Sequence, residues 1–354
     1  MVAVADNSDP AAHAESGAPA PGAVCTLADV ARLAGVSTST VSRVLNGTAG
    51  VKADKAELVR AAVAQLNFRL NPLAQGLARG RSMTLGVITQ SIESPYYAEA
   101  MRGVEDQLDG SGFMPLFVSG HWDEAVEAEC LNLLQARRVD GVVVMHARLS
   151  DAALQAAARQ LPMVVVGRHL RGPQMWSFEC DDFEGARAAT RHLLQLGHRQ
   201  IAHIGGPDNH PDALERLRGY QAALTEAGIT PDPTWVVPGD LHEQSGLLAT
   251  YRLLDAGCRF TALFCANDQM AFGARLALDR RGLRVPDDVS LVGFDDLPVS
   301  AFMCPPLTTV HQSGRDLGRL AVQALVALLA GETPEGAAPD STLMLRDSTQ
   351  RLRR

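Results

Sequence analysis

The spacing of apolar residues changes along this chain of 354 residues and divides it into two parts. Between Thr26 and Asn67, apolar side chains recur every three or four positions, which predicts short amphipathic helices. From Met83 onward, short apolar runs alternate with amphipathic stretches, a pattern typical of buried parallel strands joined by helices. The predicted strands cover residues 85–89, 115–119, 141–145, 163–167, 201–205, 235–238, 261–265 and 289–294.

Stretches with helical spacing separate these strands and follow them. Because strands and helices alternate in two sets, the pattern predicts two doubly wound α/β lobes with parallel sheets. Ligands of such sheets bind in the crevice at the carboxyl ends of the strands, so the ligand site is expected between the lobes. The predicted helices cover residues 97–110, 123–136, 150–160, 183–196, 212–227, 243–256, 268–281 and 313–329, and a closing strand lies near 342–345.

The first two helices carry capping signals. Thr26 is placed to cap a first helix, Asp29 can complete a capping box, and Gly35 ends that helix. Ser37 is placed to cap a second helix. Two short helices joined by a tight glycine turn predict a helix-turn-helix, whose second helix suits a DNA major groove. The residues that this second helix turns outward are Thr38, Ser39, Thr40, Ser42 and Arg43.

Two further helical segments follow. A third helix, roughly residues 53–67, begins after Lys52, which has no side-chain oxygen for capping. Asn71 and the proline after it then open a very short helix over residues 73–78. So short a helix is marginal in water, and Gly76 weakens it further. We therefore expect this segment to be disordered until another molecule holds it.

Charge is distributed unevenly over a chain whose net charge is −8. Residues 26–81 hold eight Lys or Arg against three Asp or Glu, a net charge of +5, whereas residues 82–354 carry −10. A small basic module on an acidic body predicts one end that meets DNA and a remainder that does not bind phosphate. The composition, 46% hydrophobic and 20% charged, is typical of a soluble globular protein, and no run is long enough to span a membrane.

Several classes of site are not indicated by the sequence. The six cysteines form no C-x-x-C motif, so we expect buried side chains in a reducing cytoplasm, without a metal or cofactor. Residues 1–25 lack the basic start and unbroken apolar core of a signal peptide, which predicts a disordered cytoplasmic tail. No Gly-rich phosphate loop follows the first strand, and no serine has a nucleophile-elbow context, which argues against an enzyme.

Motifs in both parts of the chain resemble those of the LacI/GalR transcription repressors. In the amino-terminal part these motifs are DVA, AGVS and TVSRVLN, and in the remainder they are LGHRQIAHIGGP, LFCANDQMAFGA, VPDDVSLVGFDD and PPLTTVHQ. The resemblance implies a headpiece joined to a periplasmic-binding-protein-like body. The implied domains are a disordered tail (1–25), a helix-turn-helix DNA-binding domain (26–70), a hinge helix and linker (71–82) and a two-lobed effector-binding and dimerisation domain (83–354).

The resemblance also implies that operator DNA is a partner. Thr38 and Ser39 fall at the family's base-reading positions, and Arg43 is expected to make a more general contact. Leu77 matches the hinge leucine that enters the minor groove and kinks the duplex, although a plain linker with Leu77 packed on the body is the alternative. The residues expected to contact DNA are Thr26, Leu27, Ser37, Thr38, Ser39, Thr40, Ser42, Arg43, Asn46, Lys52, Ala74 and Leu77.

Effector binding is implied for the cleft between the lobes. Arg216 and Asp295 match the family's effector-binding Arg and Asp, and Asn267 matches an amide partner; the alternative is a structural ion pair that bridges the lobes. Arginine supplies a fork of donors, and a carboxylate can accept hydrogen bonds from two neighbouring hydroxyls. The other expected contacts are Gln90, Ile92, Tyr96, Tyr97, Met145, Arg168, Leu241 and Gln312. His146 is the one histidine expected near the cleft.

These groups favour a sugar or sugar acid that acts as an inducer, because hydroxyl-matching side chains dominate and Tyr96 and Tyr97 offer ring faces for stacking. A purine-like co-repressor and a soluble sugar receptor without DNA function are the alternatives. Leu241 and Gly167 depart from the pattern of relatives and leave the effector's identity open. The last residues contain no leucine heptad, which favours a homodimer over a tetramer.

Overall fold

The computed structural model describes residues 25–45, 50–68 and 81–352. Contacts within the chain separate residues 1–79 from residues 80–354, and each of these units is described by itself. The predicted tail, Asn46, and the hinge segment with Ala74 and Leu77 lie outside the described residues.

The amino-terminal unit is a small bundle of three helices: α1 (Leu27–Ala34), α2 (Thr38–Leu45) and α3 (Ala53–Gln65). One fully buried valine from each helix, Val30, Val41 and Val59, meets in its core. The predicted capping box is confirmed, because the Thr26 hydroxyl accepts from the Asp29 amide and the Asp29 carboxylate accepts from the Thr26 amide. The Ser37 hydroxyl accepts from the Thr40 amide, 3.3 Å away, and so caps α2.

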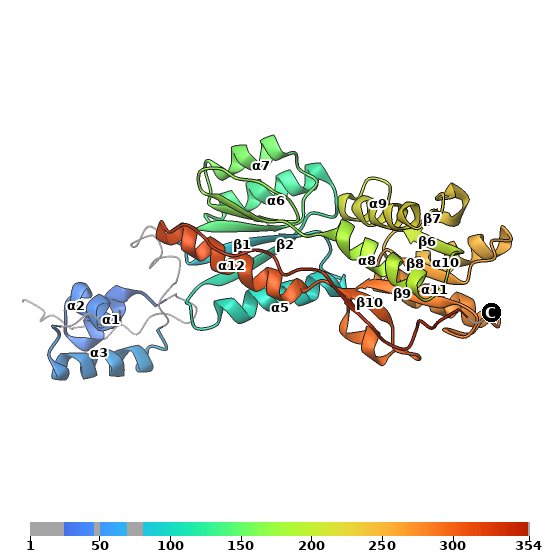
Figure 1. The fold of residues 1–354 in the computed structure, drawn as a ribbon. Helices are drawn as coiled ribbons and strands as arrows, with labels where there is room; N and C mark the ends of the chain where they lie inside the picture. The colour runs from blue at the N-terminus through green and yellow to red at the C-terminus, as the bar shows by residue number, and fades with distance from the viewer. Residues whose placement is uncertain (1–24, 46–49, 69–80, 353–354) are drawn as a thin grey trace, which may run out of the picture. The chain divides into compact units, whose positions relative to one another are not determined.

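The first lobe of the larger unit is built on a parallel sheet in the order β2-β1-β3-β4-β5. Helices α6 and α7 cover one face of this sheet, and α5 with α12 cover the other (Figure 1). Apolar side chains therefore point to both faces, which is why the strands read as continuous apolar runs. The strands are β1 (Thr84–Thr89), β2 (Met114–Ser119), β3 (Gly141–Met145), β4 (Met163–Val166) and β5 (Met175–Phe178); the helices are α5 (Pro95–Leu108), α6 (Glu124–Ala136), α7 (Asp151–Ala158) and α12 (Gly314–Ala330).

The second lobe has a sheet in the order β11-β10-β9-β8-β6-β7, parallel except for β11. Helices α8 and α9 pack on one face, and α10 and α11 pack on the other. The strands are β6 (Ile201–Gly205), β7 (Val236–Pro238), β8 (Ala262–Cys265), β9 (Ser290–Asp295), β10 (Thr308–His311) and β11 (Thr342–Met344); the helices are α8 (Asp182–Gln195), α9 (Pro211–Glu226), α10 (Glu243–Asp255) and α11 (Asp268–Arg280), with the short 3-10 turns η1 (Pro233–Trp235) and η2 (Pro298–Phe302).

Helix α12 returns to the first lobe and packs against α5 (Figure 1). Glycines make this close approach possible: a Cβ on Gly103 would collide with the Arg315 carbonyl, and one on Gly318 would collide with the Ala100 carbonyl. The chain therefore passes between the lobes three times, after β5, after β10 and after α12.

The two-lobed α/β architecture and the helical headpiece are confirmed. Strands β5 and β10 were not among the predicted elements, and the third headpiece helix ends at Gln65 rather than Asn67, whose φ is +45°. Among the described residues, no helix is long and apolar enough to cross a membrane.

Candidate functional site

Helix α2 turns short polar side chains to the surface of the headpiece. Ser37, Thr38, Ser39 and Arg43 are exposed, while Thr40 and Ser42 are partly buried. The Ser37 hydroxyl lies 2.8 Å from that of Ser39 and 2.9 Å from that of Thr40. Hydroxyls held in this way can donate to or accept from base edges and phosphates, so the exposed part of α2 is suited to a groove of DNA.

Three other residues expected to contact DNA flank this surface. Thr26 is engaged in capping α1, since its hydroxyl donates to the Asp29 carboxylate at 2.6 Å. Leu27 is partly exposed at the start of α1. Lys52 is exposed before α3 and makes no side-chain cap, as its residue type predicted. Its ammonium group adds a cation at a helix N-terminus, where phosphate is the favoured partner.

A cavity of about 150 Å³ lies between the two lobes of the larger unit. This volume is below the roughly 300 to 1,000 Å³ typical of sites for drug-sized ligands, so the cavity suits a small molecule. The sequence predicted that Tyr96, Tyr97, Arg216, Leu241, Asn267, Asp295 and Gln312 would line it, and the structure brings these seven together there.

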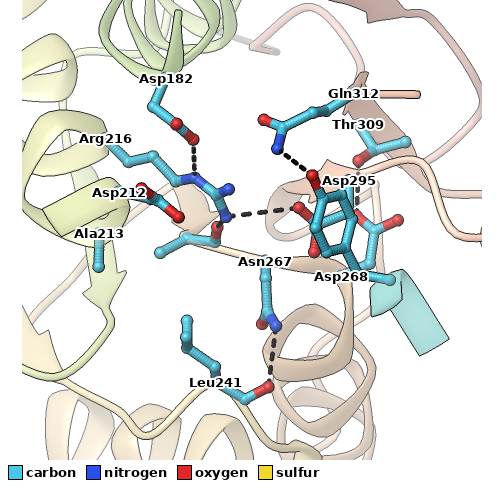
Figure 2. A network of polar contacts seen from close by, with 12 residues as sticks. Asp182, Asp212, Ala213, Arg216, Leu241, Asn267, Asp268, Asp295, Thr309 and Gln312 are labelled. Atoms are coloured by element: carbon cyan, nitrogen blue, oxygen red, sulfur yellow. Dashed lines mark hydrogen bonds and ion pairs between the residues drawn. The ribbon is translucent and has the colours of Figure 1, made fainter. Parts of the chain in front are cut away.

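Arg216 is the buried cation at the centre of this site (Figure 2). Its Nε donates to Asp182 at 2.7 Å, and one terminal nitrogen donates to the Ala266 carbonyl at 2.6 Å. The same nitrogen lies 3.5 Å from a carboxylate oxygen of Asp295, and the guanidinium stacks on the Phe294 ring at 3.8 Å. Burial raises the pKa of Asp182 to about 6, although Arg216 opposes that rise. Arg216 is thus held rigidly by the second lobe alone, with part of its fork left for a ligand.

Asp295 ends β9 with a φ of +102°, which turns its side chain into the cavity. Its carboxyl accepts no hydrogen bond from the described residues, and Arg216 is its nearest cation. Burial raises the pKa of Asp295 to about 8, with Arg216 acting in the opposite direction. A buried carboxyl without a hydrogen-bond partner is costly, and a ligand that supplied hydroxyl groups would satisfy it.

Asn267 lines the cavity but is largely engaged with the protein. Its side-chain oxygen accepts from the Met270 amide at 2.9 Å and so caps α11. Its Nδ2 donates to the Leu241 carbonyl at 2.8 Å (Figure 2). Asn267 therefore holds the loop that carries Leu241, whose φ is +71°, against the start of α11.

Aromatic rings form the first-lobe side of the cavity. Tyr96 and Tyr97 pack edge to face at 5.3 Å between ring centroids, and both belong to the first turn of α5. The Tyr96 hydroxyl accepts from Gln312 Nε2 at 2.9 Å. Trp122, on the loop after β2, adds a third ring. These faces are able to stack on an apolar face of a ligand.

Four residues predicted to contact the effector do not line the cavity. Gln90 is buried behind it, where it donates to the His146 carbonyl and accepts from the Trp122 amide. Ile92 is 52% exposed on the surface, and Met145 is fully buried in the core of the first lobe. Arg168 is occupied by the Leu149 carbonyl and the Asp151 carboxylate. A match in sequence position to the effector contacts of the resembled family thus does not place these four side chains in the cavity.

Residues that the sequence analysis missed complete the lining. His146 was the one histidine expected near the cleft, but His210 and His242 line the cavity. Asp212 could have been found, because it lies four residues before Arg216 and so on the same face of α9. The missed lining residues are Ser91, Ser94, Trp122, Arg148, Pro207, Asn209, His210, Asp212, Asp240, His242 and Gln269.

Comparison with known proteins gives matches over both units. Residues 26–71 match the description "Bacterial regulatory proteins, lacI family", and residues 190–349 match "Periplasmic binding protein-like domain". The HTH-type transcriptional repressor PurR of Haemophilus influenzae is 39% identical over 307 residues, which cover 86% of this chain and 90% of that protein. The repressor of the same name from Photobacterium profundum is 34% identical over 305 residues, covering 86% and 91%.

Two solved structures resemble the whole described fold. The lac repressor dimer bound to operator and the anti-inducer ONPF superposes with a TM-score of 0.84 at 35% identity, covering 92% of this chain and 99% of that one. The complex of the transcriptional regulator CelR with cellobiose gives a TM-score of 0.68 at 34% identity, with the same coverage.

Proposed function

This chain belongs to the lacI family of DNA-binding transcriptional repressors, and from that premise we propose that a sugar or sugar acid binds between its lobes and changes its affinity for operator DNA. The similar proteins are repressors and regulators rather than enzymes. The proposal concerns the identity of the effector, its action as an inducer, and the residues that bind the effector and the DNA.

The observation that carries the proposal is the buried pair of Arg216 and Asp295. Arg216 keeps part of its donor fork free, and the Asp295 carboxyl lacks a hydrogen-bond partner among the described residues. Two neighbouring hydroxyl groups of a sugar can accept from the first and donate to the second. The tyrosine rings opposite supply the apolar surface on which a pyranose stacks. The similar CelR structure holds cellobiose, which supports a carbohydrate as the class of ligand.

For DNA, we propose that α2 enters the major groove with Thr38 and Ser39 nearest to the bases. Arg43 and Lys52 would contact phosphates, because both are exposed cations on the basic unit. A homodimer would bring two such units to the halves of a pseudo-palindromic operator, as the similar lac repressor dimer is bound to its operator. Effector binding would then shift operator affinity by about 5- to 150-fold, the range of ordinary allosteric coupling.

A panel of monosaccharides, disaccharides, sugar acids and nucleobases tests the proposed ligand class. Each compound is screened by thermal shift, and each hit is then titrated into a complex with promoter DNA labelled for fluorescence anisotropy. We expect a sugar to raise the melting temperature and to release the DNA. A nucleobase that tightened DNA binding, with every sugar silent, would overturn the sugar assignment.

A pair of variants tests the proposed site. Asp295→Asn should keep DNA binding but lose the response to the sugar by at least tenfold in apparent Kd, because an amide nitrogen replaces one of the two carboxyl oxygens that can accept from the sugar hydroxyls. Asp208→Asn is the matched control, since Asp208 is an exposed carboxylate of the same lobe that does not line the cavity. Equal sugar responses in the two variants would contradict the role of Asp295.

A further inference from the structure

Three contacts cross from one lobe to the other along one rim of the cavity. The His146 Nδ1 atom of the first lobe lies 3.1 Å from a carboxylate oxygen of Asp212 in the second. Arg148 donates to the Asn209 carbonyl at 2.6 Å. The rings of Trp122 and His210 pack with centroids 3.9 Å apart. The first residue of each pair follows a strand of the first lobe, and the second lies at or just before the start of α9.

The first-lobe members of this rim are fixed relative to one another. Gln90 is fully buried and bridges them, with its Nε2 donating to the His146 carbonyl at 2.8 Å and its Oε1 accepting from the Trp122 amide at 2.9 Å. Gly167 has a φ of +91°, and a Cβ there would lie 2.5 Å from His146 Nδ1. The absence of a side chain at Gly167 thus makes room for the imidazole of His146.

The surroundings of His146 favour its charged form. Its side chain is 4% exposed and lies among the rings of Tyr96, Tyr97 and Trp122, with centroids 5.9, 6.1 and 6.4 Å away. The charged and titratable groups that face it are Asp212, Asp182, Arg216, His210, Tyr96 and Tyr97.

Burial lowers the pKa of His146, but Asp212 and then Asp182 outweigh burial and the opposing Arg216, so that the pKa is raised above its ordinary value. Burial likewise tends to raise the pKa of Asp212, yet His146, His210 and Arg216 hold it low. His210 behaves differently, because burial lowers its pKa to about 4 and keeps it neutral at physiological pH.

We propose that protonated His146 and Asp212 form a clasp that closes the two lobes over the cavity, and that the loss of the proton from His146 as the pH rises releases the lobes. In the closed form an ionised Asp212 beside a neutral imidazole would be a nearly buried charge that has lost its cationic partner at 3.1 Å, whereas opening returns both groups to water. The ligand-free protein would thus close or open according to pH, whichever effector it binds.

Trp122 reports on this clasp, because its contact with His210 exists only while the rim is closed. The chain has three tryptophans, so Trp176→Phe with Trp235→Phe leaves Trp122 as the sole indole. Acrylamide quenching of this full-length protein is measured between pH 6.5 and 9.5, where His210 stays neutral. We expect quenching to be weak at pH 6.5 and to rise at least twofold through a transition of one proton.

His146→Gln and Asp212→Asn, each introduced into the protein with Trp122 as its sole tryptophan, should abolish the transition. Circular dichroism checks that each variant is folded, and one folded variant is enough for the test. His311→Gln is the matched control, because His311 pairs with Asp296 at 3.0 Å within the second lobe only, and its pKa is also raised by that partner.

The His311→Gln control should keep the transition. A flat profile in the parent protein, or a transition that survives in the folded His146 and Asp212 variants, would overturn the clasp. Neither result depends on a sugar, so a failure here is distinct from a failure of the proposed effector.

Discussion

Asp268 joins three segments of the second lobe through one buried carboxyl. One of its oxygens accepts from the Leu297 amide at 2.9 Å and from the Ser300 hydroxyl at 2.5 Å, and the other accepts from the Thr309 hydroxyl at 2.5 Å. The start of α11, the turn η2 and strand β10 are thereby tied together beside Asp295. Burial nonetheless raises the pKa of Asp268 to about 7, against the effect of these hydrogen bonds.

The variant Asp268→Asn should therefore change how stability depends on pH. A folded-state pKa above the unfolded value means that the folded protein binds the extra proton, so this stability is present at low pH and is lost as pH rises through about 7. Between pH 5 and pH 8, we expect the free energy of unfolding to fall by roughly 2 kcal/mol more in the wild type than in the variant. Urea unfolding at the two pH values measures this, and equal losses would contradict it.

A site residue could be predicted from the sequence only where it stands in a recognisable motif within one segment of the chain. Arg216, Asn267 and Asp295 each stand in a motif that a reader can find along the chain. The role of His210 and Trp122 follows only from the contact between their rings, and the two residues are 88 positions apart on different lobes. The rim contacts could not be predicted because no local spacing encodes the approach of two lobes.

Helices α5 and α12 show how close packing depends on glycine. The Ala100 carbonyl lies where a Cβ of residue 318 would stand, and this contact is made by backbone that cannot move aside. Gly318→Ala should therefore lower the free energy of unfolding by about 2 kcal/mol, typical of overpacking in a core. Chemical denaturation measures the loss. Gln323→Ala, on the exposed face of the same helix, is the control and should be nearly neutral.

Helix α3 could be stabilised by a substitution, because its N-cap residue, Lys52, makes no side-chain hydrogen bond to the helix. Lys52→Ser should stabilise the start of α3 by about 0.5 to 1 kcal/mol, because serine can accept from the free amides there. Hydrogen exchange of residues 53–65 should slow about two- to fivefold. The same change should weaken DNA binding and reduce its salt slope by about one, if Lys52 neutralises a phosphate. Lys52→Ala separates the two effects, since it should lose the phosphate contact without gaining protection.

The elements themselves were largely predictable, since long apolar runs bounded by glycine or polar residues specified most strands. Strands β5 and β10 were missed because their sequences, MWSF and TTVH, contain no continuous apolar run. Their conformation depends on neighbouring strands: β5 pairs with β4, and β10 lies between β9 and β11. Pairing of this kind is a tertiary effect that a short stretch of sequence does not reveal.

The uneven distribution of charge over the whole molecule predicts that DNA binds to the amino-terminal unit. Deleting residues 1–81 should abolish binding to promoter DNA, because the remainder carries a net charge of −10. The shortened protein should keep its thermal shift with the effector, since the cavity lies wholly within residues 80–354. Anisotropy with labelled DNA and thermal shift measure the two properties, and DNA binding by the shortened protein would refute the assignment.

The three passages of the chain between the lobes restrict how the lobes can move. Two bodies joined by one segment of chain can twist and slide past each other, whereas three connections leave fewer relative motions. We therefore expect a small molecule that binds in the gap to change the angle between the lobes rather than to stiffen each lobe.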